Sequence, residues 1–143
     1  MMVSSSFCNS FHIYNQVETF IMENKMHEVA SKLIEIHNQL KFFHWQTTSY
    51  ARHQAYGGAY DALTVLIDNF VEVMMGKYGR VPALPMKVYN RNEKDCMTFI
   101  EETIAYLLML STALNPQTDS DLLNIRDEMV AEFNKLKYLL TLK

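Results

Sequence analysis

The sequence contains few of the residues that interrupt helices. Its 143 residues include only four glycines and three prolines. A fold of many short strands joined by tight turns needs more of both, so their scarcity favours a few long helices. The chain is long enough to form one domain with a complete hydrophobic core.

Cysteines and hydrophobic segments of membrane length are also scarce. The two cysteines, Cys8 and Cys96, form neither a CxxC pair nor a disulfide framework, and we interpret them as free thiols. No apolar run reaches the roughly 18 residues that a membrane span needs. Residues 1–10 lack the basic and apolar regions of a signal peptide. We therefore expect a cytoplasmic protein without a membrane span.

Positive charge is missing from the N-terminal part of the chain. The formal net charge is −3, and no Lys or Arg precedes Lys25. Proteins that bind nucleic acids usually carry a basic patch or tail, because phosphate contacts supply much of their affinity. The charge pattern therefore disfavours a nucleic-acid partner.

Four segments have hydrophobic residues at helical spacing. They begin near Glu18, Arg52, Asn92 and Thr118. Residues 1–17 are rich in Ser and Asn and show no clear period, which predicts an N-terminal tail or extension. The pattern predicts an all-α four-helix bundle over residues 18–143.

The connector at residues 80–91 leaves the order of the helices open. Twelve extended residues reach at most about 40 Å, and the preceding predicted helix of about 27 residues has the same length. A long crossover from one end of the bundle to the other therefore just fits. A simple up-down-up-down bundle fits as well.

Four residues suggest metal chemistry: His44, His53, Asp68 and Glu72. Imidazole and carboxylate together suit iron, zinc or manganese. Asp68 and Glu72 lie one helical turn apart, so they share a face. His53 and Asp68 are separated by about 22 Å if their helix is continuous, too far to bind one ion. Two antiparallel copies of this helix would bring His53 of one copy level with the carboxylates of the other.

Other interpretations of these residues carry no chemistry. Most helical histidines are structural, and a pair such as Asp68 and Glu72 is commonly a solvated surface. Gly57 and Gly58 could break the second helix, since each costs about 1 kcal/mol in a helix interior.

The spacing of these residues resembles that of the Dps family, the miniferritins of the ferritin-like superfamily. Members carry a His-Trp pair late in the first helix and a second His early in the next. An Asp and a Glu follow this second His after fifteen and nineteen residues. His44-Trp45, His53, Asp68 and Glu72 match this pattern, and both offsets agree.

This resemblance implies a ferritin-like bundle and an iron-oxidising enzyme, a ferroxidase. His44 and His53 of one subunit, with Asp68 and Glu72 of its neighbour, would bind ferrous iron, and peroxide or dioxygen would oxidise it to a stored ferric mineral. Trp45 would intercept radicals. A homodimer would be the smallest active unit, and a dodecamer the larger assembly.

Two features differ from the family pattern. The interval between His44 and His53 is about three residues shorter than usual. Gly57 stands where many members have a further acidic ligand or a residue that supports the ligands.

Two other functions remain open at this stage. A non-catalytic dimeric helical bundle with a structural or interaction role would use the same aromatic and Met residues as core. A DNA-protecting Dps would share the fold, but the charge pattern argues against it. Ferrous oxidation distinguishes the first hypothesis from the non-catalytic bundle, and a gel shift at low salt tests DNA binding.

Overall fold

The computed structural model describes the backbone from Ser5 to the C-terminus, and the side chains of Gln16 and of residues 25–143. Four α-helices follow one another: α1 (Ser5–Gln46), α2 (Tyr50–Tyr78), α3 (Cys96–Met109) and α4 (Ser120–Leu139). Short 3-10 turns, η1 (Glu93–Asp95) and η2 (Leu110–Thr112), flank α3. The described residues contain no strand. The protein is therefore an all-α four-helix bundle, as its sequence predicts.

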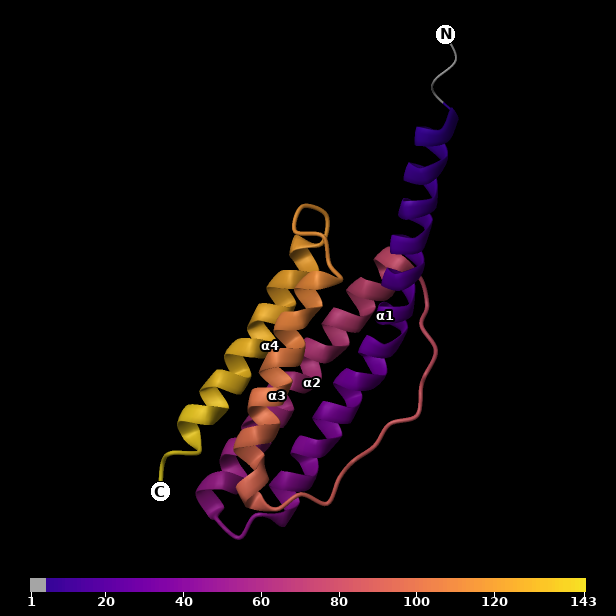
Figure 1. Ribbon diagram of the computed structural model, residues 1–143. Helices are drawn as coiled ribbons and strands as arrows, with labels where there is room; N and C mark the ends of the chain where they lie inside the picture. Colours follow the sequence, from indigo (N-terminus) through magenta and orange to yellow (C-terminus); the bar gives the residue numbers. More distant parts are fainter. Residues whose placement is uncertain (1–4) are drawn as a thin grey trace.

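The first helix begins earlier than the hydrophobic pattern indicated. We expected it to start near Glu18, whereas α1 begins at Ser5. Residues 1–4 of the predicted tail lie outside the described residues. A hydrophobic stripe marks only the part of a helix that packs against a neighbour, so it does not report a helix that extends beyond the bundle. Figure 1 shows α1 continuing past the ends of the other helices.

The other helix ends have local causes. Ser49 caps the start of α2 by accepting a hydrogen bond from the Arg52 N–H, and Gly79 ends it with φ at 87°. This left-handed conformation favours glycine because a Cβ would be strained there. Gly57 and Gly58 do not break α2, which is continuous. A capping box forms between Asn92 and Asp95 at η1, close to the predicted start of the third helix.

The core runs along the axis of the bundle between all four helices. Hydrophobic side chains at helical spacing bury one face of each, and every fully buried Leu or Phe contributes about 1.5–3 kcal/mol. The largest side chains with less than 2% exposure are Tyr56, Phe70, Phe133, Leu33, Leu40, Leu63, Met74, Ile100, Leu107, Leu122, Met129 and Leu136.

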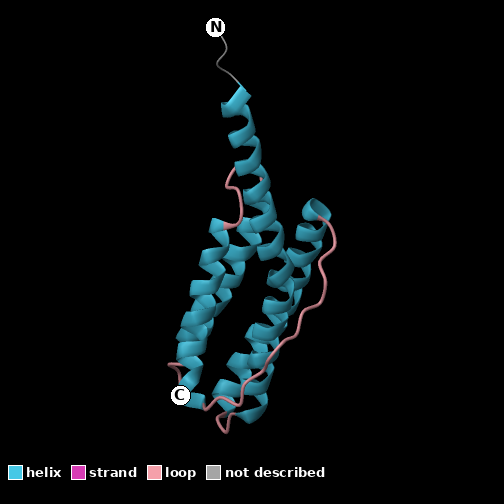
Figure 2. Ribbon diagram, turned by 45° about the vertical axis from the view of Figure 1, so that its right-hand side comes forward, coloured by secondary structure: helices cyan, strands magenta, loops and turns pink. Residues whose placement is uncertain are grey.

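A long crossover joins α2 to α3, which decides between the two arrangements that the sequence left open. Figure 1 shows α1 and α4 running in one direction and α2 and α3 in the other. The segment between Tyr78 and η1 has no regular secondary structure and follows the bundle for most of its length (Figure 2). The helix α2 packs against both α1 and α4, and α3 packs against α4.

The crossover is attached to α1 by three polar side chains one turn apart. Ser31 accepts from the Leu84 N–H at 2.9 Å, and Glu35 accepts from the Lys87 N–H at 3.1 Å. Gln39 forms two bonds to Tyr89, accepting from its N–H at 2.8 Å and donating to its carbonyl at 3.0 Å. These contacts satisfy backbone groups that an extended segment cannot satisfy by itself.

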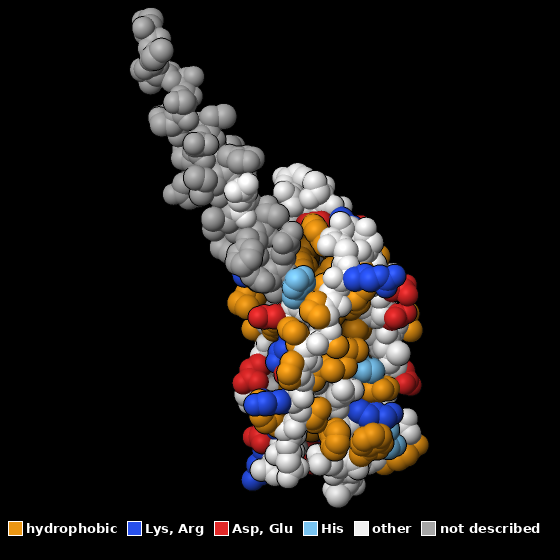
Figure 3. Space-filling model, turned by 90° about the vertical axis from the view of Figure 1, so that its right-hand side faces the viewer, with side chains coloured by type: hydrophobic (Ala, Val, Ile, Leu, Met, Phe, Trp, Pro, Cys, Tyr) orange, Lys and Arg blue, Asp and Glu red, His pale blue; other side chains and the backbone are white. Residues whose placement is uncertain are grey.

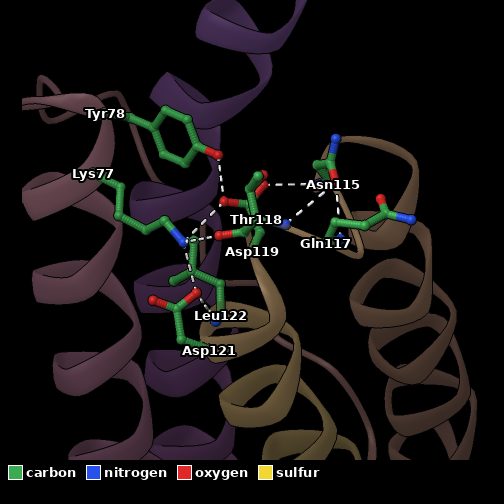
Figure 4. Close-up of polar contacts among 8 residues, drawn as sticks. All are labelled: Lys77, Tyr78, Asn115, Gln117, Thr118, Asp119, Asp121 and Leu122. Atoms are coloured by element: carbon green, nitrogen blue, oxygen red, sulfur yellow. Dashed lines mark hydrogen bonds and ion pairs between the residues drawn. The ribbon is translucent and has the colours of Figure 1, made fainter.

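A buried carboxylate holds the turn between α3 and α4 against the end of α2 (Figure 4). Asp119 is 1% exposed and accepts hydrogen bonds from the Tyr78 hydroxyl and from the Asn115 N–H. The Lys77 ammonium lies 3.1 Å from Asp119 and 2.7 Å from Asp121. Burial raises the pKa of Asp119, but these donors outweigh burial and hold the pKa below its usual range. The cluster thus has a structural role.

Within the described part of the chain, no helix is both long enough and apolar enough to cross a membrane.

Candidate functional site: a paired-histidine turn and the α1–α2 face

Two of the predicted site residues meet at the turn between α1 and α2. Only residues 47–49 separate the helices. The turn is closed by hydrogen bonds from the Thr47 N–H to the Phe43 carbonyl at 3.1 Å and from the His53 N–H to the Ser49 carbonyl at 2.9 Å. This tight connection brings His44, near the end of α1, beside His53, in the first turn of α2.

The two imidazoles form a reciprocal pair. Their ring centroids are 3.8 Å apart, with the planes inclined by 22°. His44 Nδ1 lies 2.9 Å from the carbonyl oxygen of His53, and His53 Nδ1 lies 2.8 Å from the carbonyl oxygen of His44. Because a carbonyl oxygen only accepts, each Nδ1 carries the proton and donates it. In the neutral form of each ring, the lone pair is therefore on Nε2, the usual arrangement of histidines that bind a metal.

The predicted carboxylates lie elsewhere on α2. Asp68 and Glu72 are both exposed and one turn apart. Neither takes part in a hydrogen bond or ion pair with the described residues. Because α2 is continuous, Asp68 lies about 22 Å along the helix from His53. The structure thus brings His44 and His53 together but does not bring them to Asp68 and Glu72 of the same chain.

A third histidine lies between these two groups. His37 is 8% exposed and stacks on Tyr60, with ring centroids 3.8 Å apart. The Thr64 hydroxyl donates to the Tyr60 carbonyl at 2.9 Å, so the Thr64 oxygen accepts from His37 Nε2 at 2.9 Å. Lys41 lies 4.2 Å from the Tyr60 ring centroid and 5.6 Å from that of Trp45, within cation–π range.

The sequence did not single out His37, and this cluster was missed. Its interval of seven residues from His44 indicates that both lie on one face of the helix. Nothing in the sequence indicated that Tyr60 and Thr64 would be its partners, because they come from the other helix.

A hollow of about 410 Å³ opens on the outer side of the α1–α2 pair. It combines hydrophobic side chains with one imidazole and one carboxylate. Its lining consists of Ala30, Ile34, His37, Thr64, Val65, Ile67, Asp68 and Val71. Val65 is 69% exposed and Ile34 is 38% exposed. Figure 3 shows hydrophobic side chains and histidines beside one another on one face of the molecule, where neither sign of charge predominates.

These features define the class: a four-helix bundle with a paired-histidine turn and a partly apolar outer face. Residues 44–140 match the family model named DUF5856, a family of unknown function, and the chain belongs to this family. The match begins at His44, so it includes all four predicted site residues.

A relative with a curated sequence comes from Enterobacteria phage T4. It is described as an uncharacterized 14.6 kDa protein in the mobD-ri intergenic region. The two sequences are 30% identical over 102 residues, which cover 70% of this chain and 75% of the phage protein. No solved structure matches the chain.

Proposed function

We propose that the protein is a Dps-like ferroxidase whose iron site is shared between two copies of the chain. His44 and His53 of one chain, with Asp68 and Glu72 of the other, bind ferrous iron as a substrate. Dioxygen or peroxide oxidises the iron to a ferric product that is stored. The active unit is a homodimer in the cytoplasm. A dodecamer would consist of six such dimers.

The observation that carries this proposal is the reciprocal histidine pair. Two imidazoles that donate from Nδ1 both have Nε2 available for an incoming cation. A borderline cation such as ferrous iron accepts nitrogen together with carboxylate oxygen, and the oxygen atoms of Asp68 and Glu72 have no partner among the described side chains. Zinc and manganese suit the same ligand types.

The need for a second chain follows from the separation along α2. Among the described residues of one chain, no three His, Cys, Asp or Glu side chains come together as a metal-ligand set. Two antiparallel copies of α2 related by a two-fold axis near Tyr60 would place His53 of each copy level with Asp68 of the other. The long crossover, which ferritin-like bundles also have, is a further likeness in connectivity.

The test measures ferrous oxidation by the wild type and by His53→Ala and Asp68→Ala. Each variant loses a ligand, so we expect both to lose most of the activity. His27→Ala and Glu128→Ala are matched controls, because they remove the same groups from positions outside the proposed site. Wild-type rates in both ligand variants would disprove the proposal.

Mixing the two inactive variants tests whether the site is shared. A dimer that contains one chain of each variant has one site without either defect and one site with both. Random pairing of equal amounts should therefore restore about a quarter of the wild-type activity, since half of the dimers each regain one of two sites. A site formed within one chain would show no recovery.

A second function is favoured by the exposed Val65 and Ile34 around the hollow. Apolar surface of this kind suits a protein–protein contact, which would make the chain a non-catalytic structural or interaction protein. Dimerisation without metal uptake, after reconstitution with excess ferrous iron, would favour this alternative.

A further inference from the structure

Gly57 lies directly against the paired histidines. It is one helical turn after His53 on α2, on the side that faces α1. A Cβ atom at this position would lie 3.1 Å from His44 Cε1 and 3.2 Å from His44 Nδ1. Both contacts are tighter than ordinary van der Waals contact, so either the ring or the helix would have to move.

The His44 ring has little freedom to move away. Its Nδ1 donates to the His53 carbonyl, its backbone carbonyl accepts from His53 Nδ1, and its face stacks on the His53 ring. A shift of the ring would lengthen a hydrogen bond or break the stack. The reciprocal histidine pair therefore depends on the absence of a side chain at position 57.

We propose that Gly57 is a positioning residue that keeps His44 in the Nδ1-protonated, Nε2-open state and itself adds no carboxylate beside the ring. This inference depends on the proposed function only where it concerns metal binding. The histidine half then offers nitrogen alone. Such ligands favour borderline transition cations, of the ferrous or zinc class, over magnesium or calcium.

Gly58 provides a matched control within the same helix. It is exposed, and a Cβ there would meet no atom within 4 Å. Replacing either glycine by alanine gives α2 the same gain in helix propensity. Any difference between Gly57→Ala and Gly58→Ala therefore reports the contact with His44.

The first readout is the state of the histidine rings, followed by nitrogen NMR without metal. We expect His44 and His53 to be Nδ1–H tautomers in the wild type and in Gly58→Ala, and His44 to lose this state in Gly57→Ala.

The second readout is affinity for zinc alone. We expect Gly57→Ala to weaken it by about 10- to 100-fold, as for other residues that orient a ligand, and Gly58→Ala to leave it unchanged.

A double variant keeps the test decisive if Gly57→Ala folds poorly. In the His44→Ala background the new methyl group meets no ring, so Gly57→Ala should raise the midpoint of denaturation as much as Gly58→Ala does. Equal behaviour of the two glycine variants with His44 present would overturn the inference. Loss of the tautomer in Gly57→Ala, with no zinc binding even by the wild type, would support the positioning role and contradict the metal site.

Discussion

At the scale of single residues, His37 shows how burial sets a charge state. Burial lowers the pKa of His37, and the nearby Lys41 lowers it further. The Tyr60 carbonyl and Asp61 act in the opposite direction but do not prevail. Asp68 lines the same hollow. The folded protein thus holds His37 neutral, with its Nε2 proton engaged by Thr64.

The lowered pKa predicts a loss of stability in weak acid. The unfolded chain takes up a proton at His37 below about pH 6.5, while the folded chain does so only at lower pH. The free energy of unfolding should therefore decrease as the pH falls below about 6.5. In His37→Gln, which can still donate to Thr64 but does not titrate, this slope should be shallower.

Urea denaturation at a series of pH values measures the effect, with His27→Gln as the control. An unchanged slope in His37→Gln would show that His37 is not the responsible group.

At the scale of elements, the crossover determines which helices run parallel. Ser31, Glu35 and Gln39 present polar groups at four-residue intervals, so they lie in a row along α1. The sequence contains this row, but its spacing does not indicate what the three side chains contact. Its role became apparent only when the connector was placed beside it, because each bond spans about 50 residues of chain.

We expect Gln39→Ala to destabilise the protein by about 1–3 kcal/mol, since it leaves the N–H and carbonyl of Tyr89 without their partner. Denaturant unfolding measures this loss, and hydrogen exchange at the Tyr89 amide should become faster. Asn69→Ala removes an exposed amide from α2 and should change stability by less than about 0.5 kcal/mol. Equal effects of the two substitutions would mean that the crossover is held by other contacts.

At the scale of the whole molecule, the outer face of α1 and α2 is the surface that the proposed function assigns to a second copy. An antiparallel arrangement would bring His53 of each chain level with Asp68 of the other, as the proposed metal site requires. A parallel arrangement would not bring these ligands together.

We expect the wild type to sediment as a dimer and Val65→Asp to sediment as a monomer. The introduced carboxylate would be buried on both sides of the interface, and an unpaired buried charge is costly. Leu108→Asp places the same charge on α3, where Leu108 is 50% exposed, and should remain dimeric. A dimeric Val65→Asp would show that the chains pair through another surface.

The sequence by itself determined that four helices form and approximately where three of them begin. Local causes are sufficient for this, namely hydrophobic spacing, the Ser49 cap before α2 and the capping box before α3. It also predicted the four candidate ligands, from residue type and interval alone.

Only the tertiary structure decided how those residues meet. The direction of α3 depends on contacts between the crossover and α1, which no local pattern encodes. The pairing of His44 with His53, the need for Gly57 and the environment of His37 each depend on atoms from two helices. Packing between distant segments sets such contacts, and the spacing of residues along one helix does not contain that information.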